Sequence, residues 1–210
     1  MRKITIAAWL LLGIAPAAQA HEVWVERDGT GPARIYLGEP AEALPEGGDP
    51  EFEKLKAPKL VPGSTAAQVR KAGYIEVAVP AGDVRVTDDS VFDPWGEEGK
   101  KEGVAYYARA GRSETRTAMP LEIAPVTAHG DAFVLRQDGK PVPAAKITVI
   151  TPDKWSKSFV AGADGVVTLP VREKGRYLLT ASREEKGDLS VAGGKVSTLH
   201  RIATTTFVTP

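Results

Sequence analysis

Apolar and polar residues alternate over short segments of this chain, and turn-forming residues separate those segments. The clearest alternation covers residues 22–26, where Val23 and Val25 fall on one side of an expected strand and Trp24 on the other. Strands separated by turns at intervals of roughly ten residues are typical of antiparallel β-sandwiches. The sequence therefore predicts an all-β fold, with further strands at residues 33–37, 74–79, 83–87, 104–108, 121–125, 133–135, 146–150, 166–169, 176–182 and 197–208.

Two connections have recognisable turn chemistry. Pro80-Ala81-Gly82 predicts a hairpin that joins the strands at 74–79 and 83–87. Residues 38–63 contain five prolines and four glycines and should be mostly loop. Within that loop, Asp49 followed by Pro50 and acidic residues predicts a short surface helix.

The first twenty residues have the pattern of a secretory signal peptide. Arg2 and Lys3 precede an apolar run at residues 4–14, and small residues stand at Ala18 and Ala20. The run is too short to span a bilayer stably. We expect cleavage after Ala20, export to the periplasm, and no membrane insertion of the mature chain.

Composition narrows the function classes. Removing Arg2 and Lys3 leaves 25 basic residues against 27 acidic ones, a net charge of −2, which favours neither nucleic acid nor a membrane surface. The chain has no cysteine, so packing alone must stabilise it, and neither a thiolate metal site nor a cysteine nucleophile can form. Gly-x-Ser-x-Gly, phosphate-loop and dinucleotide motifs are absent from the sequence, which favours a binding protein over an enzyme.

The second half of the chain has its own pattern of turns and strands. Asp138-Gly139, Ala163-Asp164-Gly165 and Gly175-Arg176-Tyr177 follow in an order that resembles the transthyretin-like, carboxypeptidase-regulatory or CnaB-type sandwich. A polar turn at residues 127–131 suggests a boundary. We therefore expect two antiparallel β-sandwich domains, immunoglobulin-like or transthyretin-like, at residues 21–125 and 126–210, after the signal peptide at 1–20.

A wider resemblance covers nearly the whole mature chain. It rests on four motifs, at residues 21–24 (HEVW), 36–40 (YLGEP), 106–111 (YYARAG) and 200–207 (HRIATTTF). These resemble a family of bacterial periplasmic proteins that includes members described as components of nickel/cobalt uptake and others left as a domain of unknown function. The resemblance implies a transition-metal cargo, nickel or cobalt before copper, and a membrane metal-uptake transporter as partner. Arg201 departs from the family pattern, because some members have a second histidine there.

The candidate ligands follow from the three histidines, His21, His129 and His200. After cleavage, His21 would offer an α-amine and an imidazole that can chelate nickel, cobalt, copper or zinc. His200 lies on an expected strand and could add a second imidazole if the first and last strands are close. Glu22 could add a carboxylate oxygen, although strand alternation directs it away from His21. The sequence therefore predicts His21, His200 and Glu22 as metal ligands.

Other features have simpler interpretations. We expect His129 to be a linker residue at the surface and the acidic loop at residues 88–98 to be solvated rather than a calcium site. Trp95 and Trp155 should pack in the core. Two alternatives to metal capture remain open: a scaffold or interaction module without metal, and a copper-dependent oxidase in which His21 and a second histidine form a brace.

Overall fold

The computed structural model describes residues 21–210, so the expected signal peptide lies outside the described residues. Strands dominate this part of the chain, and its helical content is one 3-10 turn, η1 (Phe52–Lys54). The predicted all-β fold is confirmed. Within residues 21–210, no helix is long and apolar enough to cross a membrane.

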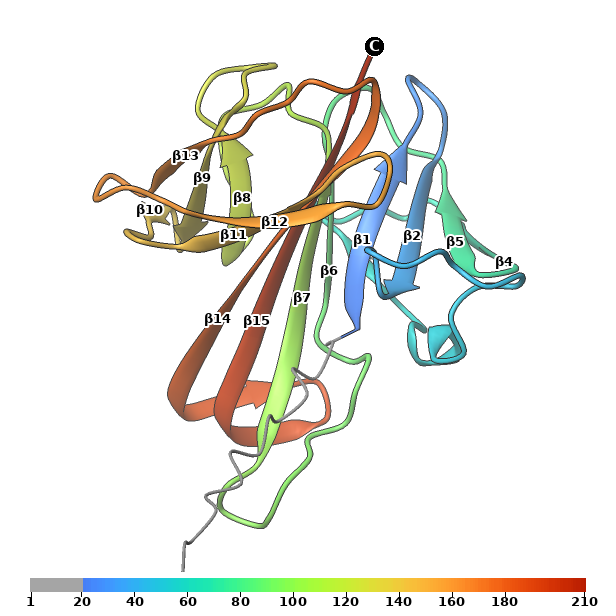
Figure 1. Ribbon diagram of the computed structural model, residues 1–210. Coiled ribbons are helices and arrows are strands. Elements are labelled where there is room, and N and C mark those ends of the chain that lie inside the picture. The colour runs from blue at the N-terminus through green and yellow to red at the C-terminus, as the bar shows by residue number, and fades with distance from the viewer. Residues whose placement is uncertain (1–20) are drawn as a thin grey trace, which may run out of the picture.

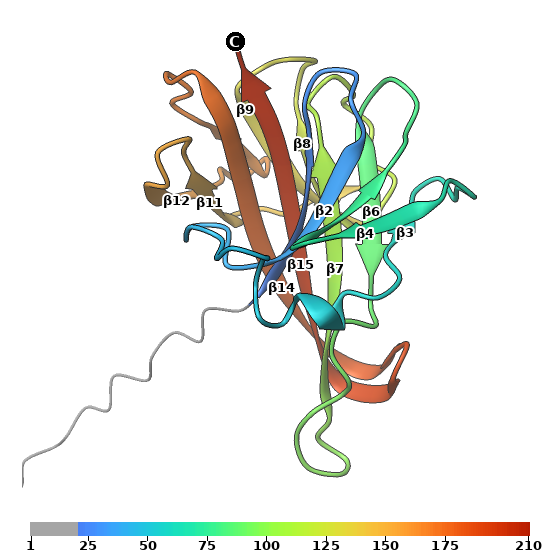
Figure 2. The same ribbon diagram turned by 90° about the vertical axis from the view of Figure 1, so that its right-hand side faces the viewer.

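The strands form three sheets that stack as three layers, and the seven-stranded sheet is the middle layer (Figures 1 and 2). The central layer has seven strands in the order β12-β11-β14-β15-β7-β6-β3. Their bounds are β3 (Lys59–Leu60), β6 (Val84–Asp88), β7 (Glu102–Ala110), β11 (Lys146–Ile150), β12 (Ser156–Val160), β14 (Gly175–Val191) and β15 (Gly194–Thr209). One outer sheet has the order β1-β2-β5-β4, with β1 (Glu22–Arg27), β2 (Ala33–Gly38), β4 (Gln68–Lys71) and β5 (Tyr74–Val77). The other contains β8 (Leu121–Pro125), β9 (Ala132–Gln137), β10 (Lys140–Pro141) and β13 (Val166–Thr168).

Strand β7 is buried on both faces, and its alternating side chains feed two hydrophobic cores. Val104 and Tyr106 enter the core beneath β1, β2 and β5, which we call the β1-side core. Ala105 and Tyr107 enter the core beneath β8 and β9, the β9-side core. A strand covered on both faces reads as a nearly continuous apolar run, which matches residues 103–108.

The central pair β7 and β15 differs from the predicted antiparallel arrangement, because the two strands run parallel. Their connection passes through the whole second half of the chain, which is long enough for a parallel crossover. The predicted boundary near residue 125 falls in the connection between β8 and β9, which pair with each other. Each core also takes residues from both predicted domains, because Leu121 lies in the β9-side core and Ile202 in the β1-side core.

Three consecutive threonines of β15 connect the layers. The hydroxyls of Thr204 and Thr206 donate to the carbonyls of Val23 and Val25 in β1, and that of Thr205 donates to Ile123 in β8. All three are buried, so each hydroxyl satisfies a backbone acceptor that water cannot reach. The Thr-Thr-Thr run is therefore explained by the three-layer architecture.

Several local predictions need correction. The segments before and after Pro80-Ala81-Gly82 do not form a hairpin, because β5 belongs to an outer sheet and β6 to the central sheet. The predicted helix near Asp49 is only the single turn η1. Strands β14 and β15 extend past the predicted ends, and their hairpin projects beyond the layers (Figures 1 and 2). Trp95 and Trp155 are 42% and 56% exposed rather than packed, because Trp95 lies in the connection between β6 and β7 and Trp155 in the connection between β11 and β12.

Candidate metal-binding site

His21 stands immediately before β1 and faces two carboxylates from the loop after β2. Its Nε2 lies 3.2 Å from Asp49 Oδ1, and its Nδ1 lies 3.6 Å from Glu51 Oε2. Asp49 Oδ1 also accepts a 2.7 Å hydrogen bond from the backbone N–H of Glu51, which fixes the two carboxylates relative to each other. These three side chains form the His21 cluster.

A glycine allows this loop to close on β1. Gly38 ends β2 at φ 153°, and a Cβ added there would lie 3.1 Å from both Cβ and Oδ2 of Asp49. A larger residue at position 38 would push Asp49 away from His21. The glycine in the Tyr-Leu-Gly-Glu-Pro motif thus has a direct structural reason.

The hydrogen bond that His21 donates to Asp49 selects the tautomer of the neutral imidazole. An ionised carboxylate can only accept a hydrogen bond, so Nε2 carries the proton and the lone pair resides on Nδ1. Glu51 Oε2 is too distant from Nδ1 for a hydrogen bond. The arrangement leaves Nδ1 as a free donor atom beside a carboxylate oxygen, and Nδ1 is the ring nitrogen closest to the backbone nitrogen of the same residue.

Two further side chains surround the His21 cluster. Phe92 presents its ring to the imidazole in an edge geometry, with centroids 6.4 Å apart. Lys54 pairs with Glu51 Oε1, and its Nζ lies 4.6 Å from the centroid of Phe92. Lys54 therefore holds one oxygen of Glu51 and leaves Oε2 directed toward His21.

The structure does not bring His21 and His200 together through any contact among the described residues. His200 Nε2 lies 2.7 Å from Glu102 Oε2, and its ring stacks on Trp95 with centroids 5.9 Å apart. Each imidazole therefore has its own carboxylate partner. A brace of two histidines on one ion would require the two imidazoles to lie side by side, and no contact among residues 21–210 joins them.

Glu22 belongs to a different environment from His21. Its Oε1 accepts a 2.8 Å hydrogen bond from the hydroxyl of Thr180 in β14, and its Oε2 is buried with no hydrogen-bond partner. Burial raises the pKa of Glu22 to about 7, although the hydrogen bond from Thr180 lowers it in part. The alternation along β1 thus separates Glu22 from the His21 cluster.

His129 lies in the connection between β8 and β9 and is exposed, as expected for a linker residue. Within residues 21–210, no three His, Cys, Asp or Glu side chains form a group that could hold a metal ion by themselves.

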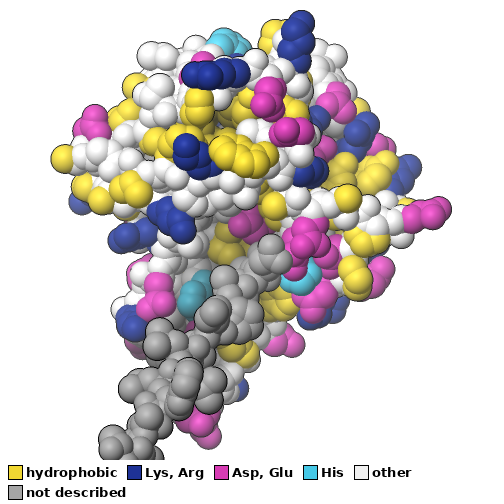
Figure 3. All heavy atoms as spheres, in the orientation of Figure 1, with side chains coloured by type: hydrophobic (Ala, Val, Ile, Leu, Met, Phe, Trp, Pro, Cys, Tyr) yellow, Lys and Arg dark blue, Asp and Glu magenta, His cyan; other side chains and the backbone are white. Residues whose placement is uncertain are grey.

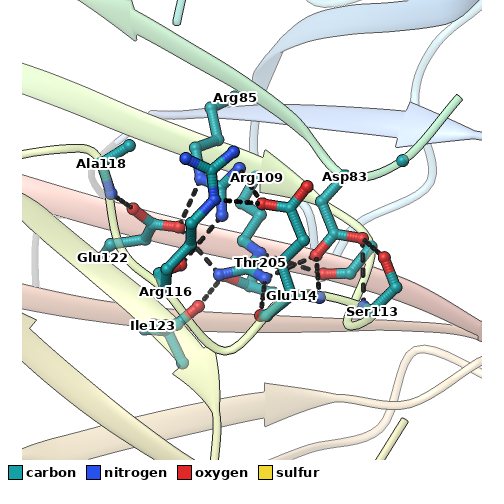
Figure 4. Close-up of polar contacts among 12 residues, drawn as sticks. Asp83, Arg85, Arg109, Ser113, Glu114, Arg116, Ala118, Glu122, Ile123 and Thr205 are labelled. Carbon is teal, nitrogen blue, oxygen red and sulfur yellow. Dashed lines mark hydrogen bonds and ion pairs between the residues drawn. The ribbon is translucent and has the colours of Figure 1, made fainter. Parts of the chain in front are cut away.

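A buried ion-pair network connects β6, β7 and β8 (Figure 4). Glu122 is fully buried and accepts 2.8 Å hydrogen bonds from Arg85 Nε and Arg109 Nη1. Its second oxygen accepts hydrogen bonds from the backbone N–H groups of Ala118 and Met119, at 2.7 and 3.2 Å. This network fixes the loop of residues 111–119 to the central sheet, and all four contacts to Glu122 are structural.

Asp83 extends the same network. Burial alone would raise its pKa, but hydrogen bonds from Ser113 and Arg109 outweigh burial and lower it. The sequence pattern did not predict these ion pairs. One signal was present, since Arg85 lies between two core valines and Arg109 between two core alanines.

The fold and the His21 cluster together define a three-layer all-β protein with a carboxylate-flanked histidine at the start of its first described strand. Comparison of the chain with protein-family models, with curated proteins and with solved structures gives no match.

Proposed function

We propose that this protein is a periplasmic transition-metal-binding protein accessory to metal uptake. In this proposal the mature chain begins at His21, and its α-amine and Nδ1 chelate one divalent ion, nickel or cobalt before copper. One observation carries the proposal: Asp49 holds Nε2 of His21 while Nδ1 lies free beside Glu51. Export and the transporter partner rest on the expected signal peptide and on the family resemblance.

The spacing of the two donor atoms suits one ion. Metal–nitrogen and metal–oxygen bonds of ~2.1 Å in a tetrahedral site place neighbouring ligand atoms ~3.4 Å apart. The 3.6 Å between Nδ1 of His21 and Oε2 of Glu51 is close to that separation. Glu51 therefore takes the third position in the proposal, in place of His200 and Glu22, which have other partners. The α-amine completes a set that side chains alone do not supply.

Asp49 has a supporting role in this proposal. Metal-binding histidines usually donate their other ring N–H to a carboxylate, which fixes the ring and raises the basicity of the ligand nitrogen. Asp49 occupies that position at 3.2 Å. Protons compete for the amine and for the imidazole, so metal affinity should fall as pH decreases.

The free amine provides the sharpest test. Adding a single glycine before His21 converts its amine into an amide, and we expect it to weaken the binding of Co²⁺ and Zn²⁺ by about 100-fold, since a chelate ligand is lost. Calorimetric titration with Ni²⁺, Co²⁺, Cu²⁺ and Zn²⁺ would compare the extended form with protein produced by true signal cleavage. His129→Gln is the matched control, because it removes an exposed imidazole outside the His21 cluster.

Equal binding in the cleaved and extended forms would contradict the chelate. Binding by neither form would instead favour the scaffold or interaction module that needs no metal.

Lys54 gives a second prediction for the same site. Its ammonium pairs with Glu51 and opposes a cation there, so Lys54→Gln should strengthen metal binding about threefold to tenfold through reduced charge repulsion. Lys56→Gln removes an exposed charge two residues away and should have a smaller effect. Titrations at low and high salt would measure both variants, and the Lys54 effect should shrink as salt increases. Weaker binding in Lys54→Gln would contradict this role.

A further inference from the structure

A cavity of about 580 Å³ opens at the end of the molecule where the C-terminus emerges (Figure 1). It lies at the opposite end of β1 from His21, because Arg27, the last residue of β1, forms part of its wall. The rest of the wall comes from the loops around Asp83 and Arg112, from His129, and from the last residues of β15. Basic side chains are visible at this end of the surface, beside some acidic ones (Figure 3).

Three arginines line this cavity, and their existing partners determine what each can still bind. Arg27 donates only to backbone carbonyls, those of Thr30, Gly31, Val79, Pro80 and Gly82. Arg27 has no carboxylate partner among residues 21–210, so its charge is not neutralised by an ion pair. Arg176 is paired with Glu26 and Asp28. Among residues 21–210, Asp83 is the one carboxylate side chain in the wall, which also includes Pro210, and Asp83 is already engaged by Arg109 and Ser113.

The guanidinium of Arg112 has one edge with no hydrogen-bond partner among residues 21–210. Its Nη1 donates to Gly130 O and pairs with Asp131, and its guanidinium lies over the ring of Phe207 at 4.4 Å. In the described part of the chain, no hydrogen bond uses Nε or Nη2 of Arg112. These two N–H groups point in parallel and form the edge that binds both oxygens of a carboxylate.

His129 is held beside this arginine. Its backbone N–H donates to the carbonyl of Arg112 at 2.7 Å, and its φ of 61° is unusual for a residue other than glycine. The imidazole has no hydrogen-bond partner within residues 21–210.

We propose that this cavity binds a small organic molecule through its carboxylate, with Arg112 as the bidentate donor and His129 as a second contact. Arg27 supplies the uncompensated positive charge. The cavity volume exceeds what a single inorganic oxyanion needs, and Ala81 and Val208 give apolar wall for a carbon skeleton. This site is independent of the proposed metal site.

The test is a titration of metal-free mature protein, followed by ¹H–¹⁵N NMR, with succinate, with 3-phenylpropionate and with inorganic phosphate. We expect both carboxylates to shift the signals of Arg112, His129 and their neighbours at lower concentration than phosphate does. Arg112→Lys keeps the charge but loses the parallel N–H pair, and should weaken carboxylate binding roughly tenfold. Arg116→Gln is the control, because that arginine is 73% exposed and its one ion pair within residues 21–210 is with Glu114.

A second variant guards against a folding defect in Arg112→Lys. His129→Gly removes the imidazole while glycine accepts the positive φ, so carboxylate binding should weaken severalfold with no loss of thermal stability. Three results would overturn the proposal: no carboxylate-induced shifts at this end of the molecule, tighter binding of phosphate than of both carboxylates, or carboxylate binding that is unchanged in Arg112→Lys and His129→Gly.

Discussion

Replacing Glu122 by glutamine should lower the free energy of unfolding by about 3–5 kcal/mol, the usual effect of removing one partner from a buried ion pair. The carboxylate is fully buried. One of its oxygens accepts hydrogen bonds from Arg85 and Arg109, and the other accepts hydrogen bonds from two backbone N–H groups. A glutamine side chain has only one acceptor oxygen, so its NH₂ group must face donors on one side. The charges of Arg85 and Arg109 would also lose their shared buried counter-ion.

Urea unfolding of the mature protein, followed by tryptophan fluorescence, would measure this effect. Glu114→Gln is the matched control, because Glu114 pairs with Arg85 at 3.0 Å but its side chain is 30% exposed. That substitution should change the free energy of unfolding by about 1 kcal/mol or less. Similar losses in both variants would show that burial of Glu122 is not the cause, and a loss below that of the control would refute the role assigned to the network.

Replacing Glu22 by glutamine should remove a large part of the pH dependence of stability. Burial raises the pKa of Glu22 from 4.5 to about 7 in the folded protein. The folded state therefore binds a proton that the unfolded state releases between these two values, and stability falls as pH rises through this window. The shift corresponds to about 3 kcal/mol lost above pH 7. Below pH 4.5 both states are protonated and this penalty is absent.

Glutamine is neutral throughout this range and can still accept the hydrogen bond from Thr180, so Glu22→Gln should be more stable than the wild type at pH 8. Its amide introduces an unpaired donor, so at pH 4.5 it should be equal or slightly less stable. Denaturant unfolding from pH 4 to 8, with chelator present to exclude metal effects, would give both curves. Glu46→Gln, at an exposed position, is the control and should leave the slope unchanged. Parallel curves for the wild type and Glu22→Gln would contradict the prediction.

The motifs that carry the family resemblance have clear structural roles in this fold. In the Tyr106–Gly111 motif, Tyr107 accepts a 2.6 Å hydrogen bond from Arg201, and Arg109 belongs to the buried network. Gly111 has a φ of 110°, and a Cβ there would lie 2.2 Å from Asp83 Oδ1. Arg201 also pairs with Glu185 at 2.7 Å. Arg201 therefore has a structural role in the sheet, at the position where some members of the resembled family have a histidine. The chemistry that we propose resides instead in the first motif, at His21.

The sequence by itself determined the local features of this protein. Alternation and turn residues predicted most strands and the all-β class, because the period of two and the turn chemistry are properties of neighbouring residues. The chelating potential of His21 also follows from one residue and an expected cleavage site. The same local reasoning placed Glu22 away from His21, which agrees with its hydrogen bond to Thr180.

Only the tertiary structure decided how distant segments meet. Asp49 and Glu51 looked like helix-start residues, yet the loop closes across 28 positions to place Asp49 on His21. His200 looked like a partner for His21, but pairing of β15 with β7 sets it beside Glu102 instead. Arg85 and Glu122 are 37 positions apart and meet only because β6, β7 and β8 pack together. Such contacts depend on strand order and loop closure, which no local pattern encodes, because they are selected by the joint burial of both cores.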